Sequence, residues 1–139
     1  MKIVGLTLFP KKNEPGINLY ELNLIEGFGI EGDYHQGGEK QITILSSETR
    51  RWIDSQTERG LCFDRFKENI LIEGLEITSG ERLTIGNAVL RISSLTKPCF
   101  DECPLVSPCR LAGRNVFAVV EKSGTIRVGD CECSTYYKA

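Results

Sequence analysis

Residues 82–95 read Arg82-Leu83-Thr84-Ile85-Gly86-Asn87-Ala88-Val89-Leu90-Arg91-Ile92-Ser93-Ser94-Leu95. Two runs rich in aliphatic and β-branched residues flank the pair Gly86-Asn87, and this pair favours the positive φ angles of a tight turn. The stretch therefore predicts a β-hairpin with strands at 82–85 and 88–95.

More short strands are predicted on both sides of this hairpin. Apolar runs of strand length recur at residues 2–9, 41–45, 69–72, 116–121, 125–128 and 131–137. One helix is predicted, from a cap at Ser46-Ser47-Glu48 to about Arg59, before Gly60. Many short strands with one clear helix indicate a mostly β protein with a β-barrel-like arrangement and one or two short helices.

Length and composition predict a single domain over residues 1–139, with 40% apolar and 26% charged residues. The formal net charge is −2, which does not provide the basic surface of a nucleic-acid-binding protein. No stretch approaches the roughly 20 apolar residues of a membrane span. The run at 2–9 is too short for a signal peptide. We therefore expect a cytoplasmic protein that binds neither nucleic acid nor membrane.

Six cysteines are present, and all except Cys62 fall near the C-terminal end. These five are Cys99, Cys103, Cys109, Cys131 and Cys133. In a reducing compartment, clustered cysteines indicate metal binding or catalysis more often than disulfides. The alternating pair at 131 and 133 favours packing in a core strand, and the apolar neighbours at 61 and 63 favour burial for the cysteine at 62.

The segment 97–110 is the least ordinary part of the chain. It contains Cys99, Cys103 and Cys109 together with three prolines, which predict an irregular loop after a strand. Loops on a rigid scaffold commonly carry reactive groups. Lys97 and Arg110 flank the cluster and favour a thiolate, whereas the acidic residues at 101 and 102 oppose it.

Cys99 is the predicted working thiolate, with Cys103 and Cys109 as further catalytic candidates. A structural thiolate-metal module is an alternative, since thiolates bind zinc and iron. The spacing C-x₃-C-x₅-C argues against it, because it lacks the paired C-x₂-C units of a zinc ribbon.

The glycine-rich stretch 29–38 matches neither a P-loop nor a dinucleotide-binding loop. It contains Asp33 and His35, the only histidine of the chain. The two side chains can orient each other or a ligand, because an imidazole donates and accepts hydrogen bonds at once. A purely structural histidine is the more common alternative.

Six short elements in order resemble the MOSC domain, which is named for the C-terminal domain of molybdenum cofactor sulfurases. They are Gly29-Ile30-Glu31-Gly32-Asp33-Tyr34-His35, Lys40-Gln41-Ile42-Thr43-Ile44-Leu45, Arg65-Phe66-Lys67-Glu68-Asn69-Ile70, Gly80-Glu81-Arg82-Leu83-Thr84-Ile85-Gly86, Pro98-Cys99 and Val128-Gly129-Asp130. Each match is short, and their order over about 100 residues carries the resemblance.

The resemblance implies a β-barrel-like fold and a role with sulfur or molybdenum cofactor (molybdopterin). Cys99 would then carry a persulfide or ligate molybdenum, and Cys103 and Cys109 would resolve a persulfide or disulfide formed there. The cofactor-binding residues it implies are Arg65 and Asn69 at the pterin and phosphate end, Lys40 as an anion contact, and Asp33 with His35.

Several functions stay open at this point. In one, the protein is a sulfur carrier that receives sulfur from a donor such as a cysteine desulfurase and serves molybdenum cofactor pathway proteins. In another, it is a small molybdenum-cofactor-dependent oxidoreductase of N-hydroxylated compounds. The structural thiolate-metal module is the third.

Overall fold

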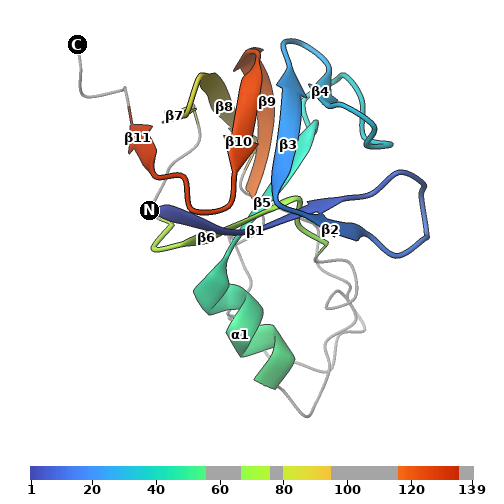
Figure 1. Cartoon of the computed structure of the whole chain (residues 1–139), viewed down its shortest axis with the longest axis vertical. Coiled ribbons are helices and arrows are strands. Elements are labelled where there is room, and N and C mark those ends of the chain that lie inside the picture. The colour runs from blue at the N-terminus through green and yellow to red at the C-terminus, as the bar shows by residue number, and fades with distance from the viewer. Residues whose placement is uncertain (56–66, 76–79, 95–115, 135–139) are drawn as a thin grey trace.

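The computed structural model describes residues 1–55, 67–75, 80–94 and 116–134. Over these ranges it consists of short strands and one helix (Figure 1). The elements are β1 Lys2–Leu8, β2 Ile17–Leu19, β3 Glu21–Ile25, β4 Gly29–Ile30, β5 Ile42–Ser46, α1 Ser47–Ser55, β6 Ile70–Glu73, β7 Arg82–Ile85, β8 Ala88–Ser94, β9 Val116–Lys122, β10 Gly124–Arg127 and β11 Glu132–Ser134. The predicted mostly β class is confirmed.

The strands form two sheets. The larger has the order β11-β7-β8-β9-β5-β6-β1-β2, and the smaller has the order β10-β3-β4. Neighbouring strands are antiparallel except β5 and β6, which are parallel and are separated in sequence by α1. Parallel neighbours need such a crossover because a tight turn cannot join them.

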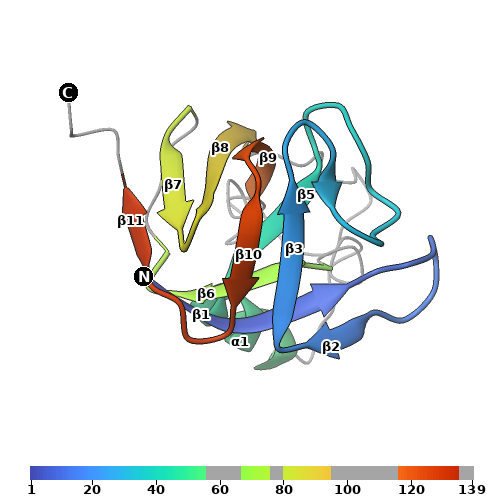
Figure 2. The ribbon, with the colours of Figure 1, turned by 45° about the horizontal axis from the view of Figure 1, so that its top comes forward.

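The larger sheet curls without closing into a barrel. Its end strands β11 and β2 do not pair with each other in the described part of the chain. In the described part of the chain, one isolated bridge pairs Cys131, the residue before β11, with Lys2 at the start of β1 (Figure 2). The β-barrel-like prediction therefore holds only loosely.

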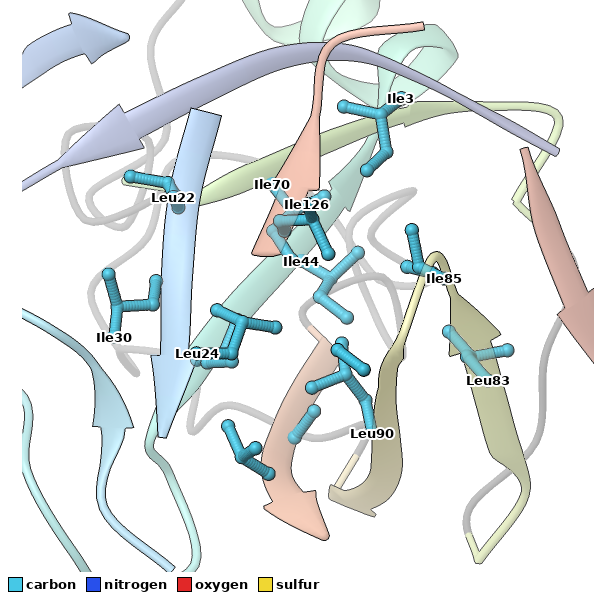
Figure 3. Packing of buried hydrophobic residues seen from close by; sticks show 14 of the residues in the cluster. Ile3, Leu22, Leu24, Ile30, Ile44, Ile70, Leu83, Ile85, Leu90 and Ile126 are labelled. Carbon is cyan, nitrogen blue, oxygen red and sulfur yellow. The ribbon is translucent and has the colours of Figure 1, made fainter. Parts of the chain in front are cut away.

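The hydrophobic core lies between the two sheets (Figure 3). Strand β3 buries Leu22 and Leu24 and exposes the residues between and beside them, as expected for a strand with one face on the core. Ile42 and Ile44 of β5 and Ile126 of β10 belong to the same cluster. The two sheets are thus held together by aliphatic side chains from both.

The predicted hairpin and helix start are confirmed. Residues 82–85 pair with 88–91 in the expected register, and Gly86 has a φ of 58° at the turn. Ser46 caps α1, since its Oγ accepts a hydrogen bond from the backbone N–H of Thr49 at 3.0 Å. The predicted helix end at Arg59 lies outside the described residues.

No helix in the described ranges is both long enough and apolar enough to cross a membrane.

Gly124 is expected to be intolerant of a side chain. A Cβ there would lie 2.6 Å from the backbone nitrogen of Ala88, so β10 or the β7–β8 turn would have to move. We expect Gly124→Ala to lower the free energy of unfolding by about 1–3 kcal/mol, the usual cost of overpacking. Urea denaturation measures this change.

The matched control is Gly5→Ala. A Cβ at Gly5 would meet the Cβ of Leu71 at 3.5 Å, an ordinary contact, so this variant should keep or slightly exceed the wild-type stability. Equal stabilities of the two variants would contradict the close approach of β10 to the hairpin turn.

Candidate functional site

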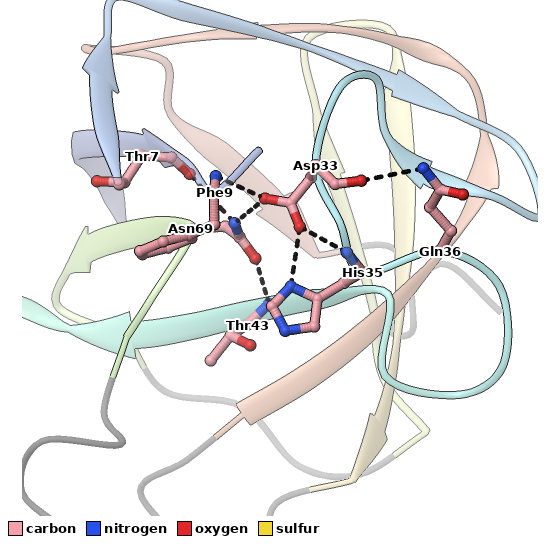
Figure 4. A network of polar contacts seen from close by, with 7 residues as sticks. All are labelled: Thr7, Phe9, Asp33, His35, Gln36, Thr43 and Asn69. Carbon is pink, nitrogen blue, oxygen red and sulfur yellow. Dashed lines mark hydrogen bonds and ion pairs between the residues drawn. The ribbon is translucent and has the colours of Figure 1, made fainter. Parts of the chain in front are cut away.

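A fully buried carboxylate, Asp33, lies at the centre of the candidate site (Figure 4). Its Oδ2 accepts hydrogen bonds from the backbone N–H of Phe9 at 3.0 Å and from Nδ2 of Asn69 at 2.9 Å. Its Oδ1 accepts from the backbone N–H of His35 at 2.9 Å and contacts the Nδ1 of the same residue at 2.8 Å. These partners offset the cost of removing the carboxylate from water.

Asn69 joins the site to three strands. It directly precedes β6 and is 1% exposed. Its Nδ2 donates to Asp33 and to the backbone oxygen of Thr7 at 3.1 Å, and its Oδ1 accepts from the backbone N–H of Thr43 at 3.0 Å. Both donors of the amide are therefore used within the fold. In this geometry the side chain acts to hold β1, β5 and Asp33 together.

The pKa of Asp33 is held below its ordinary value. Burial acts to raise this pKa, but the hydrogen bonds from His35 and from the backbone of Phe9 favour the charged form more strongly. The side chain is therefore a buried anion at neutral pH.

His35 connects this anion to the surface. Its side chain is 30% exposed while that of Asp33 is fully buried. The ring of Tyr34 packs against the imidazole with a centroid distance of 3.9 Å and an interplanar angle of 33°. Residues 34–40 line an open hollow next to the two rings.

Lys40 supplies a positive charge at the end of this hollow. Its Nζ lies 4.7 Å from the centroid of the Phe117 ring, a cation–π distance. Within the described ranges no carboxylate lies at ion-pair distance from the Lys40 ammonium, which is thus available to an anionic ligand.

Two side chains hold the stretch that lines this hollow against the larger sheet. Gln41 is buried, donates from Nε2 to the backbone oxygen of Gly38 at 3.1 Å, and accepts from the backbone N–H of Val120 at 2.9 Å. Ser93 of β8 donates from its hydroxyl to the backbone oxygen of Glu39. The stretch that carries Lys40 is therefore fixed to β8 and β9.

Four residues form a row across the larger sheet, which we call the Thr43 row: Asn69, Thr43, Phe117 and Ser94. Asn69 bonds to Thr43 through backbone and side chain, Thr43 pairs with Phe117, and Phe117 pairs with Ser94. The cysteine-containing segment 95–115 follows Ser94 and ends one residue before β9. The residues that flank this segment, Ser94 and Val116, thus lie in the Thr43 row and next to it. Lys40 contacts the same row at Phe117.

Of the predicted site residues, the structure brings Asp33, His35 and Asn69 into one network and places Lys40 beside the same row. Arg65, Cys99, Cys103 and Cys109 lie outside the described residues, and Cys62 does as well. Contact of any of these residues with a cofactor stays a prediction.

Core packing was the wrong prediction for Cys131, which is exposed and free. It sits in an isolated bridge before β11 and not inside a paired strand. Sequence reasoning missed Phe117, which falls in an apolar run without a motif, and assigned no role to Gln41, although Gln41 lies in the quoted element 40–45. No group of three or more potential metal ligands occurs in the ranges the structure describes.

Comparison with known proteins places these features in context. The family model described as MOSC domain matches residues 31–110. No curated protein matches the chain. Among solved structures, the YuaD protein from Bacillus subtilis is similar with a TM-score of 0.68 and 22% identity, covering 93% of this chain and 92% of that one.

Two YiiM structures are also similar. The protein from Escherichia coli gives a TM-score of 0.63 and 19% identity, covering 96% of this chain and 70% of that one. The protein from Geobacillus stearothermophilus gives 0.66 and 18%, covering 96% and 74%. At these identities the three structures show a shared fold.

Loss of the Asn69 side chain should destabilise the protein strongly. Asn69→Ala removes one donor from the buried Asp33 and leaves the Thr43 N–H and the Thr7 carbonyl without their side-chain partner. We expect the free energy of unfolding to fall by about 2–4 kcal/mol, since each buried unpaired group costs roughly 1–3 kcal/mol. Asn23→Ala removes side-chain hydrogen bonds to Glu31 and Thr125, but these are exposed to water, so it should cost no more than about 1 kcal/mol. A similar loss for both variants in urea denaturation would argue against the network.

Acid should erase the contribution of Asp33 to stability. A carboxyl whose folded pKa is lowered stabilises the fold above its unfolded pKa, and this contribution is lost as pH falls through the folded pKa. The stability difference between wild type and Asp33→Asn should therefore be largest near neutral pH and shrink below about pH 3.9. Urea denaturation at several pH values tests this, and a pH-independent difference would contradict it.

Proposed function

Because the chain belongs to the MOSC domain family, we propose that it handles sulfur or molybdenum cofactor through the thiolate of Cys99. The observation that carries the proposal is the Thr43 row. It joins the residues that flank the cysteine-containing segment to the stretch that bears His35 and Lys40. Four residues lie between Ser94 and Cys99. The five Cα–Cα steps between them therefore keep their Cα atoms at most roughly 18 Å apart.

Molybdenum cofactor is the ligand that the described residues support best. Its phosphate is anionic, and Lys40 offers an exposed ammonium that no described carboxylate neutralises. A soft thiolate such as that of Cys99 suits a soft metal. Of the described residues, Lys40 fits the phosphate end of the group. Arg65 would join it at the phosphate and Cys99 would face the metal, as the family resemblance implies for these two residues. When bound, the cofactor supplies a redox-active metal.

The chain's own residues would orient such a ligand. Gln41 and Ser93 hold residues 38–40 against the larger sheet, so the ammonium of Lys40 approaches the ligand from a fixed backbone. Asp33 holds His35 beside the same hollow. Positioned charges of this kind act without reorganising when the ligand arrives.

A sulfur carrier is the second candidate, and the openness of the hollow favours it. An exposed site suits a protein donor such as a cysteine desulfurase. The Cys99 thiolate would attack the outer sulfur of the donor's persulfide, forming a Cys99 persulfide and releasing the donor cysteine as a thiolate. Molybdenum cofactor pathway proteins would then be the acceptors.

The test is metal and pterin analysis of protein purified from a host that makes molybdenum cofactor. We expect near-stoichiometric molybdenum and pterin fluorescence in wild type and loss of the metal in Cys99→Ser. Lys40→Gln should weaken cofactor binding about tenfold to a hundredfold, since a charge-assisted hydrogen bond contributes roughly 1.5–3 kcal/mol. Lys122→Gln, at an exposed position on β9, is the charge-matched control and should bind like wild type.

Equal molybdenum in wild type and Cys99→Ser would contradict the ligand role of Cys99. Absence of molybdenum and pterin from wild type would contradict cofactor binding and leave the sulfur carrier. Mass spectrometry after incubation with a desulfurase and cysteine would then have to show a sulfur adduct that is missing in Cys99→Ser.

A further inference from the structure

We propose that the free edge of β2 binds a second copy of this chain, by antiparallel pairing of the two β2 strands about a two-fold axis at Asn18. Strand β2 is the last strand of the larger sheet and lies at the margin of the molecule in both ribbon views (Figure 1, Figure 2). The inference goes beyond the proposed function and uses none of the residues assigned to it.

The backbone of Asn18 faces the open edge of the sheet. Thr7 of β1 lies opposite Asn18, but Asn69 on the other side of β1 accepts from the Thr7 N–H at 2.8 Å and donates to its carbonyl at 3.1 Å. Opposed residues of an antiparallel pair alternate between exchanging backbone hydrogen bonds and directing these groups away from each other. Thr7 and Asn18 are therefore of the second kind, and the N–H and C=O of Asn18 point outward. Neither has a backbone partner in the described part of the chain.

The side chains of β2 continue the apolar face of the larger sheet. Leu19 lies opposite Leu6, which is buried in the core, and Ile17 lies opposite Leu8, which packs against the core. Opposed residues of neighbouring strands project their side chains to the same face. The side chains of Ile17 and Leu19 are nevertheless 49% and 38% exposed. The core-facing side of the sheet thus ends in two aliphatic side chains that the protein itself does not cover.

This edge is complementary to itself. In an antiparallel pair centred on Asn18, the two Asn18 residues exchange two backbone hydrogen bonds, because both direct N–H and C=O to the edge. Ile17 of each copy then lies opposite Leu19 of the other. Leu6 and Leu19 of one copy continue into Ile17 and Leu8 of the second copy, which makes an unbroken apolar row across four strands.

Other sheet edges in the described structure are protected and β2 is not. Natural proteins block edge strands with charges, prolines, bulges or cover. Strand β11 carries Glu132, β10 carries Arg127 paired with Glu21 at 3.6 Å, and both residues of β4 are buried. Strand β2 reads Ile-Asn-Leu, is exposed throughout and pairs with β1 without a register shift. Its composition therefore favours pairing with a further strand.

The charges that flank β2 favour a second copy of the chain as that strand. Antiparallel pairing about Asn18 brings the loop 10–16 of one copy towards Glu21 of the other, since residue 15 falls opposite residue 21. The loop carries Lys11 and Lys12 against the single acid Glu14, and all three are exposed. Opposite charges thus approach at both ends of the paired strands, which favours this orientation.

Sedimentation velocity of the full chain tests the proposal. Three-residue strands joined by two backbone hydrogen bonds form a small interface, so we expect a Kd on the order of 0.1 mM. Wild type should be a monomer near 10 μM and mostly a dimer near 1 mM, concentrations roughly tenfold below and above that Kd. A reducing agent is present throughout, because Cys131 is exposed and could cross-link two copies.

Asn18→Pro should weaken the dimer about tenfold or more. The substitution removes the outward N–H, which β1 does not use, and leaves the carbonyl of the other copy without its donor. Asn18→Ala is the matched control: it keeps the N–H and should change the Kd less than about threefold. Amide spectra show whether each variant is folded.

A second pair of variants tests the apolar row. Ile17→Lys places a charge opposite Leu19 of the other copy and should weaken the dimer about tenfold or more. Ile25→Lys, at a similarly exposed isoleucine of β3, should dimerise like wild type. This pair decides the question if Asn18→Pro fails to fold.

A monomer at 1 mM would overturn the proposal. A dimer of unchanged affinity in folded Asn18→Pro or in Ile17→Lys would also overturn it, because the contact would then lie on another surface. Molybdenum and persulfide analysis judges the proposed function separately, whatever the oligomeric state.

Discussion

The carboxylate of Asp33 is removed from water, and the arrangement of the candidate site follows from what that burial requires. An ion in the protein interior costs several kcal/mol unless hydrogen bonds replace its hydration. The replacement donors come from Phe9 after β1, from Asn69 before β6 and from His35 in the same turn. Satisfying one charge therefore ties together three parts of the chain that are distant in sequence.

The hydrogen bonds of Asp33 also position the rest of the site. Asn69 also bonds to Thr43 of β5, which begins the row that continues through Phe117 to Ser94. Lys40 lies over Phe117, and the cysteine-containing segment departs from and returns to the same row. Lys40, the Asp33–His35 pair through Asn69, and the residues that flank the cysteine-containing segment are thus connected to one row of the larger sheet. The thiolate chemistry proposed for Cys99 relies on this common attachment.

Local signals in the sequence were sufficient for much of the fold. The Gly86-Asn87 turn and the Ser46 cap act within a few residues, so the hairpin and the helix start could be predicted. Pairing between distant strands could not. Strand β10 follows β9 directly in the chain but pairs with β3 of the other sheet, and β5 pairs in parallel with β6. Such choices depend on how the whole core packs.

The candidate site was predictable to a similar extent. The short spacing of Asp33 and His35 suggested that they orient each other, and their contact follows from that spacing. The inclusion of Asn69 in the same network depends on the meeting of β1, β5 and β6, which no local pattern reveals. Cys131 illustrates the converse error, because alternation predicted a core position where the chain only bridges Lys2.

The function proposed for Cys99 requires that its thiol reaches the hollow beside His35, and a spin label tests this requirement most directly. Cys99 would carry the label in a protein whose other cysteines are serine, and the ring signals of the single histidine would be observed by NMR. The account predicts strong broadening of these signals. A label on Cys131 is the control. Cys131 bridges Lys2, which lies about 20 Å or more along β1 from Phe9, and Phe9 contacts the same Asp33 carboxylate as His35. Equally weak broadening from both labels would contradict the account.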